Sequence, residues 1–193
     1  MPRQVVEFLQ EANRRVAEFI ESGRSQLTGF VPSDYAVAYR ALQAIRAGHL
    51  VSGNRFCEWG SGFGIVAILA AMLDFDASGI EIEPTLVDHA NQLADDFACP
   101  VEFVCGSFIP RGAERLAEEM YEESDSFWLV TETDESYDEL GLEPDDFDLI
   151  FAYPWPNESS IITKLFERTA AHGALLLTFS HLDSLRLVRK VSA

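Results

Sequence analysis

Basic residues are scarce in this chain of 193 residues, which has 14 lysines and arginines against 32 aspartates and glutamates. The resulting formal net charge of -18 argues against non-specific binding to nucleic acids or anionic membranes, because both need clustered positive side chains. We therefore expect no nucleic-acid partner and no membrane partner. The charge is compatible with a small-molecule substrate or with a basic protein partner.

Cysteines and long apolar runs are also few. The three cysteines are Cys57, Cys99 and Cys105, an odd number that does not fit a disulfide framework, so we expect reduced and mostly buried thiols. The first residues lack the apolar core of a signal peptide, and no run approaches the roughly 18 apolar residues of a membrane span. A cytoplasmic location is the expectation that follows.

Several common catalytic patterns are missing as well. The four histidines are scattered, and no spacing typical of metal ligands is present, so we expect no metal site. Neither a Gly-x-Ser-x-Gly turn nor a Walker A lysine loop occurs.

The most informative stretch runs from Phe56 to Leu73, with the sequence FCEWGSGFGIVAILAAML. A short apolar run ends at Glu58, and Gly60, Gly62 and Gly64 follow at every second position before a continuous apolar segment. This pattern predicts a strand, a tight turn and a buried helix, because glycine reaches positive φ without a Cβ clash. The first N–H groups of such a helix would face the turn and favour polar or anionic ligand atoms.

Signals for helices and strands alternate along the rest of the chain. The patterns predict helices at 4–22, 35–47, 85–97 and 160–171, and strands at 77–82, 101–104, 147–153, 174–179 and 185–191. This alternation predicts an α/β fold, with a doubly wound, mostly parallel sheet in three α/β/α layers. We expect one domain over 1–193, with N-terminal helices in 1–50 and the last strand at a sheet edge.

The segment 109–146 is unusually long and acidic. It holds 14 of the 32 acidic residues against only Arg111 and Arg115, which amounts to a net charge of -12. An ordinary crossover between parallel strands is shorter, so we interpret the segment as an insert, with a helix at 113–121 and an extra strand at 126–131. It is either a solvated face or an acidic collar that steers a cationic substrate or partner.

Glu81 lies 21 positions after Gly60 (81 − 60), where the strand predicted at 77–82 ends. In nucleotide-binding α/β folds, an acid about 20 residues after the first glycine accepts hydrogen bonds from ribose hydroxyls. Glu81 is therefore a candidate ribose ligand, and the alternative is a solvated strand end.

Two segments resemble motifs of a known family. EWGSGFG resembles motif I, and GIEIEP resembles motif II, of the class I S-adenosylmethionine-dependent methyltransferases, which have a Rossmann-like fold. The resemblance implies S-adenosylmethionine as the cofactor, with its methionine end at the glycine turn and its ribose at Glu81 rather than Glu83. The expected cofactor-binding residues are Glu58, Gly60, Ser61, Gly62, Gly64, Glu81, Ile82, Ser107 and Phe108.

The resemblance is looser after the third and fourth predicted strands. Ser107 occupies the position of an acid that commonly contacts adenine in the family, and Phe108 is either an adenine-stacking residue or a core residue. Tyr153 replaces the Asn or Asp that opens motif IV, so amide or adenine N-methylation is not implied. Tyr153 is the one candidate catalytic residue. The expected acceptor-side residues are Tyr35, Pro154 and Trp155.

The implied function is methyl transfer by in-line displacement to an unidentified small-molecule or protein acceptor. Orientation of the reactants can supply much of the acceleration of such a reaction. Two alternatives stay open: a non-catalytic, S-adenosylmethionine-binding regulatory or partner protein, and a nicotinamide-dependent oxidoreductase. No oligomeric state is predicted.

Overall fold

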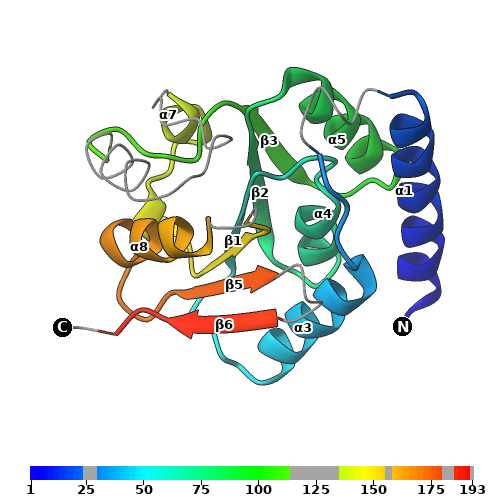
Figure 1. Ribbon diagram of the computed structural model, residues 1–193. Coiled ribbons are helices and arrows are strands. Elements are labelled where there is room, and N and C mark those ends of the chain that lie inside the picture. The colour runs from blue at the N-terminus through cyan, green and yellow to red at the C-terminus, as the bar shows by residue number, and fades with distance from the viewer. Residues whose placement is uncertain (24–29, 114–134, 155–157, 180–184, 192–193) are drawn as a thin grey trace.

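The computed structural model describes residues 1–23, 30–113, 135–154, 158–179 and 185–191. The described strands form one six-stranded sheet in the order β3-β2-β1-β4-β5-β6 (Figure 1). The strands are β1 (Arg55–Trp59), β2 (Asp76–Glu81), β3 (Val101–Cys105), β4 (Leu149–Ala152), β5 (Leu175–Phe179) and β6 (Leu185–Arg189). Strands β1 to β5 pair in parallel and β6 runs antiparallel to β5, which confirms the predicted doubly wound, mostly parallel sheet with its last strand at the edge.

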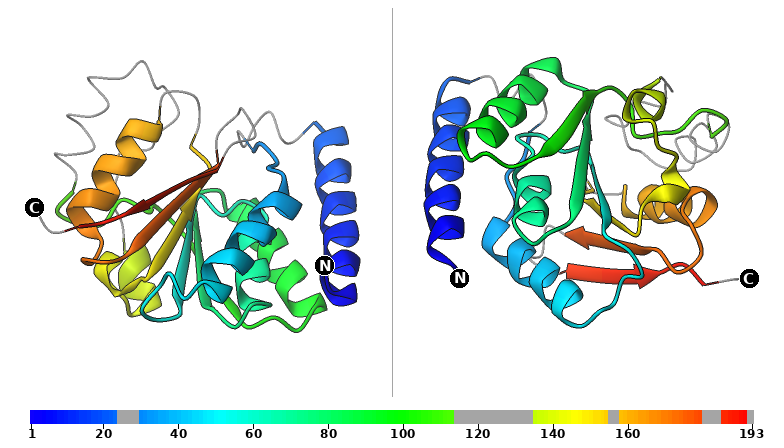
Figure 2. Two further views of the ribbon diagram at one scale, coloured as in Figure 1. Left: turned by 90° about the horizontal axis from the view of Figure 1, so that it is seen from below. Right: turned by 180° about the vertical axis from the view of Figure 1, so that it is seen from behind.

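Helices cover both faces of this sheet. The helical elements are α1 (Arg3–Glu21), α3 (Tyr35–Ala47), α4 (Ile65–Ala71), α5 (Pro84–Asp96), α7 (Ser136–Leu140), the 3-10 turn η1 (Pro144–Asp146) and α8 (Ser159–Thr169). Helices α1, α3, α4 and α5 lie on one face, and α7 and α8 lie on the other (Figure 2). Each face encloses its own apolar core, so the predicted three layers are present.

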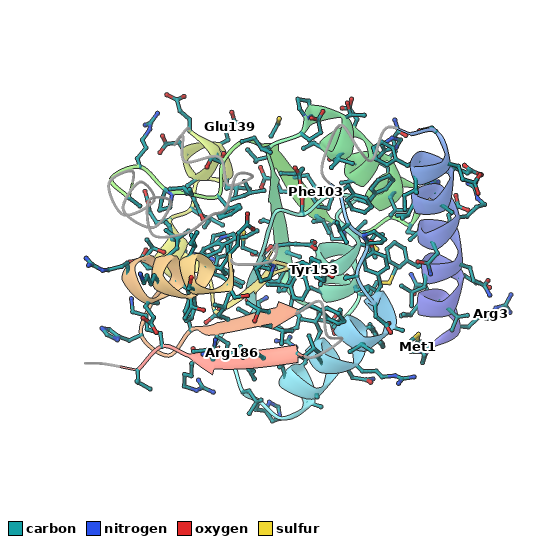
Figure 3. The ribbon with its side chains drawn as sticks, in the orientation of Figure 1. Met1, Arg3, Phe103, Glu139, Tyr153 and Arg186 are labelled. Carbon is teal, nitrogen blue, oxygen red and sulfur yellow. The ribbon has the colours of Figure 1, made fainter. Side chains whose placement is uncertain are left out.

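Local sequence signals explain where the helices begin. The Asp34 carboxylate accepts a hydrogen bond from the Val37 N–H at 3.0 Å, which caps α3. Pro84 is the first residue of α5, where an N–H group would have no partner within the helix, so proline loses no hydrogen bond there. Figure 3 shows the contrast between buried and exposed side chains. Phe103 lies inside the molecule on β3, whereas Arg3 projects outward from α1.

Some expectations about single residues were wrong. Ile20 follows the apolar spacing that suggests the buried face of α1, but 40% of its surface is exposed. Of the three thiols only Cys57 is buried, because Cys99 is half-buried and Cys105 is exposed at the end of edge strand β3.

The described part of the acidic segment holds two elements that the sequence did not predict. Helix α7 and the turn η1 were not foreseen, since both are short and lie within the long acidic segment. The helix predicted at 113–121 and the strand predicted at 126–131 lie outside the described residues, apart from Ala113. Among the helices of the described part, none is both long and apolar enough to cross a membrane.

Strand alternation sends the two residues at the end of β1 to opposite faces of the sheet. Glu58 contacts the first turn of α4 through the Ala67 N–H, whereas Trp59 belongs to the core beneath α8. Two neighbouring residues therefore contribute to opposite sides of any site at this end of the sheet.

Candidate functional site

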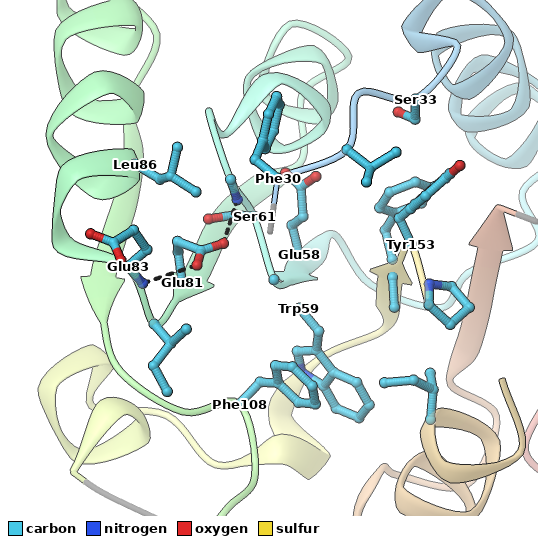
Figure 4. Close-up of a pocket in the computed structure, with 18 of the residues that line it drawn as sticks. Phe30, Ser33, Glu58, Trp59, Ser61, Glu81, Glu83, Leu86, Phe108 and Tyr153 are labelled. Carbon is cyan, nitrogen blue, oxygen red and sulfur yellow. Dashed lines mark hydrogen bonds between the residues drawn. The ribbon is translucent and has the colours of Figure 1, made fainter. Parts of the chain in front are cut away.

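A cavity of about 360 Å³ opens at the carboxyl ends of β1, β2 and β4 (Figure 4). The strand order reverses direction between β1 and β4, and ligands of open α/β sheets bind at such a switch point. The volume also falls in the range of small-molecule sites. The predicted site residues that line the cavity are Tyr35, Glu58, Gly60, Ser61, Gly62, Glu81, Ile82, Ser107, Phe108, Tyr153 and Pro154.

One side of the cavity is formed by Glu58, Gly60, Ser61, Gly62 and Glu81, which we call the glycine-loop wall. The N–H groups of Gly60 and Ser61 donate to the Ile80 carbonyl at 2.9 and 3.0 Å, which ties the turn to β2. Gly60 and Gly62 have φ values of 70° and 54°, a region that costs other residues about 1–2 kcal/mol. The tight turn was predicted from the glycine spacing alone.

Glu81 joins the end of β2 to the glycine loop. Its Oε2 atom accepts from the Gly62 N–H at 2.7 Å, and its Oε1 atom accepts from the Glu83 N–H at 3.0 Å. Burial raises the pKa of the Glu81 carboxyl, and these two hydrogen bonds act in the opposite direction. The carboxylate is thus fixed at the cavity edge by main-chain donors.

Glu58 is held in a similar way at the end of β1. Its Oε2 atom accepts from the Ala67 N–H at 2.8 Å, in the first turn of α4, and the residue is 5% exposed. Burial raises the pKa of Glu58 well above the usual range of a carboxyl group, and the charge of Glu81 adds to the shift. The pKa of the nearby Tyr35 hydroxyl is also raised, first by burial and then by Glu58.

The third glycine of the motif has another role than the first. A Cβ atom on Gly64 would lie 2.2 Å from Cζ of Phe103, and Gly64 is not among the described residues that line the cavity. A Cβ atom on Gly60 would meet no atom within 4 Å. Gly60 therefore leaves the loop open toward the cavity, whereas Gly64 lets the loop and α4 pack against β3.

The opposite side is formed by Trp59, Phe108, Pro154, Glu158 and Ile162, which we call the β4–α8 wall. Trp59 and Phe108 stack with ring centroids 5.4 Å apart and an interplanar angle of 10°, and Figure 4 shows the pair across the cavity from Glu81. Within the described part of the chain, Nε1 of Trp59 is buried without a hydrogen-bond partner.

Three other buried or half-buried groups complete the site. The Oγ atom of Ser61 is buried and also has no hydrogen-bond partner among the described residues. The hydroxyl of Ser107 accepts from the Ile109 N–H at 3.2 Å, which orders the turn after β3. The Tyr153 ring stacks on Phe179 at 5.7 Å and lines the cavity.

Trp155, which was expected on the acceptor side, lies outside the described residues. Sequence reasoning did not include Trp59, Glu158 and Ile162 in the expected site. Trp59 could have been included, because it follows Glu58 at the end of the same strand. Strand alternation then sends its side chain to the opposite face of the sheet. In the sequence, Glu158 follows the proline-containing stretch 154–156 and precedes an amphipathic segment, a context that equally fits an exposed helix start.

The loop before α3 closes the cavity from a third direction. Phe30, Val31, Ser33 and Tyr35 line it, so a ligand in the cavity would meet this loop. A Cβ atom on Gly62 would lie 2.7 Å from the Phe30 ring, so the loop packs closely on the glycine turn.

Neither a protein-family model nor a curated protein sequence matches this chain. Solved structures do match it. An RNA methyltransferase from Salinibacter ruber, in complex with S-adenosyl-L-homocysteine, aligns with a TM-score of 0.51 at 18% identity over 77% of this chain and 76% of its own. The fold is that of the Rossmann-like methyltransferases.

Two further structures with this methyltransferase fold extend the comparison. A putative S-adenosyl-L-methionine-dependent methyltransferase from Methanococcus maripaludis has a TM-score of 0.53 at 13% identity and covers 86% of this chain. An S-adenosylmethionine-dependent methyltransferase from Agrobacterium tumefaciens has a TM-score of 0.51 at 10% identity and covers 78%. This chain spans 63% and 45% of the lengths of those two proteins. At such identities the likeness concerns the fold.

Proposed function

We propose that this protein binds S-adenosylmethionine in the cavity and transfers its methyl group to an acceptor held at the β4–α8 wall. The single observation that carries the proposal is the hydrogen bond between Glu81 and the Gly62 N–H, 19 residues apart, at the rim of a cavity at the switch point. The methyltransferase fold of the chain supports it.

The residues present fit such a cofactor. Gly60 leaves its backbone open to the cavity, and Ser61 offers a buried hydroxyl with no hydrogen-bond partner in the described chain. Glu58 supplies a carboxyl group that would pair in its ionised form with the cationic methionine end, and Glu81 supplies one for the ribose hydroxyls. Ile82 and Phe108 add apolar surface for the adenine ring.

When bound, S-adenosylmethionine supplies a methyl group activated by a sulfonium sulfur. The chain then has to hold the acceptor in line with the methyl group and exclude water. Orientation of the two reactants can by itself accelerate such a reaction strongly. Trp59, Pro154 and Ile162 offer a rigid apolar surface for this task. Tyr153 lines the same cavity and is our candidate for a residue that moves a proton.

Calorimetric titration of the full chain with S-adenosylmethionine and with S-adenosylhomocysteine tests the proposal. We expect binding by the wild type and at least roughly tenfold weaker binding by Glu81→Gln, since a hydrogen bond to a charged group is worth about 1.5–3 kcal/mol. The matched control is Glu102→Gln, which changes an exposed glutamate on the neighbouring strand β3.

If the wild type binds neither compound, the proposal is wrong and only the fold remains. If it binds both and Glu81→Gln binds as tightly as Glu102→Gln, the ribose role of Glu81 is wrong. Methyl transfer to an acceptor, followed by release of S-adenosylhomocysteine, separates a transferase from a protein that merely binds the cofactor.

A further inference from the structure

Two buried carboxyl groups lie beside the glycine loop, and the structure supports their negative charges unequally (Figure 4). Glu81 is 8% exposed and accepts hydrogen bonds from the N–H groups of Gly62 and Glu83. Glu58 is 5% exposed, and from the described part of the chain its side chain accepts one hydrogen bond, from the Ala67 N–H. Because main-chain donors stabilise a carboxylate, the ionised form is better supported at Glu81 than at Glu58.

The surroundings of Glu58 give a negative charge little further support. Its neighbours across the sheet, Gly79 on β2 and Phe151 on β4, carry no charge. The described residues that line the cavity include no lysine, arginine or histidine. A carboxyl group that is buried without a cationic partner usually takes up a proton, because the charged form is costly away from water.

The ionisable groups around Glu58 do not supply the missing positive charge. Burial raises the pKa of Glu58 well above its usual range, and the negative charge of Glu81 adds to this shift. Burial also raises the pKa of Tyr35 on α3 and of Cys57 on β1, so both groups are uncharged at neutral pH. The other ionisable residues of the described lining likewise carry no positive charge; they are Glu83, Tyr153 and Glu158.

Building on the proposed function, we propose that Glu58 is protonated in the protein without cofactor and releases this proton when the cationic methionine end of S-adenosylmethionine binds. The proton passes to the solvent, and the carboxylate that remains pairs with the positive charge of the ligand, which favours its ionised form. Glu58 is then a specificity-determining residue, because it selects ligands that carry a positive charge at this position. An uncharged ligand leaves Glu58 protonated.

The affinity for S-adenosylmethionine should therefore rise with pH. Below the pKa that Glu58 has in the free protein, binding has to remove a proton, so the affinity should increase by up to about tenfold per pH unit. The increase ends above that pKa, because the free protein is then already ionised. Calorimetric titration of the full chain between about pH 5 and about pH 7 measures this dependence while the α-amino group of the ligand keeps its proton.

Proton release is measured directly by titration at about pH 6.5 in phosphate and in imidazole, two buffers with different heats of protonation. The control ligand is 5′-methylthioadenosine, which shares the adenosine part and carries no charge. From the wild type we expect release of up to about one proton with S-adenosylmethionine and none with the control ligand. Glu58→Gln should release none with either, whereas Glu102→Gln, which changes an exposed residue of β3, should behave as the wild type.

Difference infrared spectroscopy of the wild type gives a second measurement that needs no variant. The carbonyl band of a protonated carboxylic acid should disappear when S-adenosylmethionine binds and persist when 5′-methylthioadenosine binds. S-adenosylhomocysteine, which keeps the ammonium but lacks the sulfonium, identifies the charge that Glu58 pairs with. Proton release with both cofactor forms indicates the ammonium, and release with S-adenosylmethionine alone indicates the sulfonium; both results support the inference.

The outcomes separate this inference from the proposed function. If S-adenosylmethionine binds without proton release and without loss of the infrared band, the inference is wrong and the proposed cofactor site stands. Equal proton release by the wild type and Glu58→Gln also overturns the inference, because another group is then the source. If S-adenosylmethionine does not bind at all, the proposed function and this inference are both wrong.

Discussion

The two walls of the cavity are built in different ways. The glycine-loop wall is fixed by main-chain hydrogen bonds, such as those from Gly62 to Glu81 and from Ala67 to Glu58. The β4–α8 wall is fixed by side-chain packing, with the Trp59–Phe108 stack and Ile162 at its centre. The glycine-loop wall fixes the positions of the main-chain groups and carboxyl groups. The β4–α8 wall fixes the shape of the apolar surface that a ligand would contact.

This difference predicts opposite tolerances to small changes. Where a glycine of the loop packs against a distant side chain, as Gly64 does against Phe103, there is no room for an added methyl group. A wall made of interlocking side chains adjusts when one carbon is lost, although each lost contact still weakens packing. Variants that add or remove a single carbon therefore separate the two designs.

Gly64→Ala is the sharpest test of the packing that supports the glycine-loop wall, because Gly64 lies behind the wall and contacts β3. Its φ of 66° strains an alanine, and the new Cβ would lie 2.2 Å from the Phe103 ring and 3.0 Å from Cβ of Ala90. Strain of about 1–2 kcal/mol and overpacking of about 1–3 kcal/mol together predict a loss of about 2–5 kcal/mol in the free energy of unfolding. Urea unfolding followed by circular dichroism measures it.

The control for that variant is Gly141→Ala. Gly141 has a similar φ of 62°, but its Cβ would meet no atom within 4 Å, so only the strain of about 1–2 kcal/mol applies. Equal losses in the two variants would show that contact with Phe103 does not constrain the loop.

The glycine-loop wall is the part that the sequence predicted best. Three glycines at alternate positions and an acid 21 residues later are local signals, and their geometry follows from backbone sterics. Even so, the spacing did not reveal that Gly64 serves packing, because Phe103 comes from a distant strand. The approximate positions of most helices and strands were likewise predicted from periodicity, which burial on the sheet enforces, whereas the order of the strands was not predicted.

The β4–α8 wall could not be predicted in the same way. Trp59, Phe108 and Glu158 come from three separate segments, and only the crossing of the chain over the sheet brings them together. Their identities carry no periodic pattern, since an aromatic residue at a strand end fits a core as well as a site. The roles of Tyr153 and of Trp155 remain predictions of the sequence.

Glu58→Gln tests the electrostatics of the glycine-loop wall. Burial raises the pKa of Glu58 in the folded protein, so the native state keeps a proton that the unfolded chain loses above its usual pKa of 4.5. The free energy of unfolding of the wild type therefore falls as the pH rises from 4.5 to the pKa that Glu58 has in the folded protein. The variant lacks this proton equilibrium, so its stability relative to wild type should rise with pH.

Urea unfolding of both proteins between pH 4 and pH 8 measures this difference. Glutamine keeps an oxygen that accepts from the Ala67 N–H, so the local hydrogen bond persists in the variant. Glu102→Gln removes an exposed carboxylate from β3 and serves as the control. If the free energies of unfolding of wild type and Glu58→Gln changed in parallel with pH, the inference that folding raises the pKa of Glu58 would be wrong.

Ile162→Val tests the tolerance of the β4–α8 wall by removing one carbon from a side chain that is 2% exposed. Such deletions typically lower the free energy of unfolding by about 0.5–1.5 kcal/mol, which is less than the loss expected for Gly64→Ala. Ile20→Val is the matched control on α1, where the isoleucine is 40% exposed and the change should stay within about 0.5 kcal/mol. Urea unfolding measures both variants, and calorimetry should show unaltered S-adenosylhomocysteine binding in each. A loss at Ile162 as large as the loss at Gly64 would mean that the β4–α8 wall is as rigid as the glycine loop.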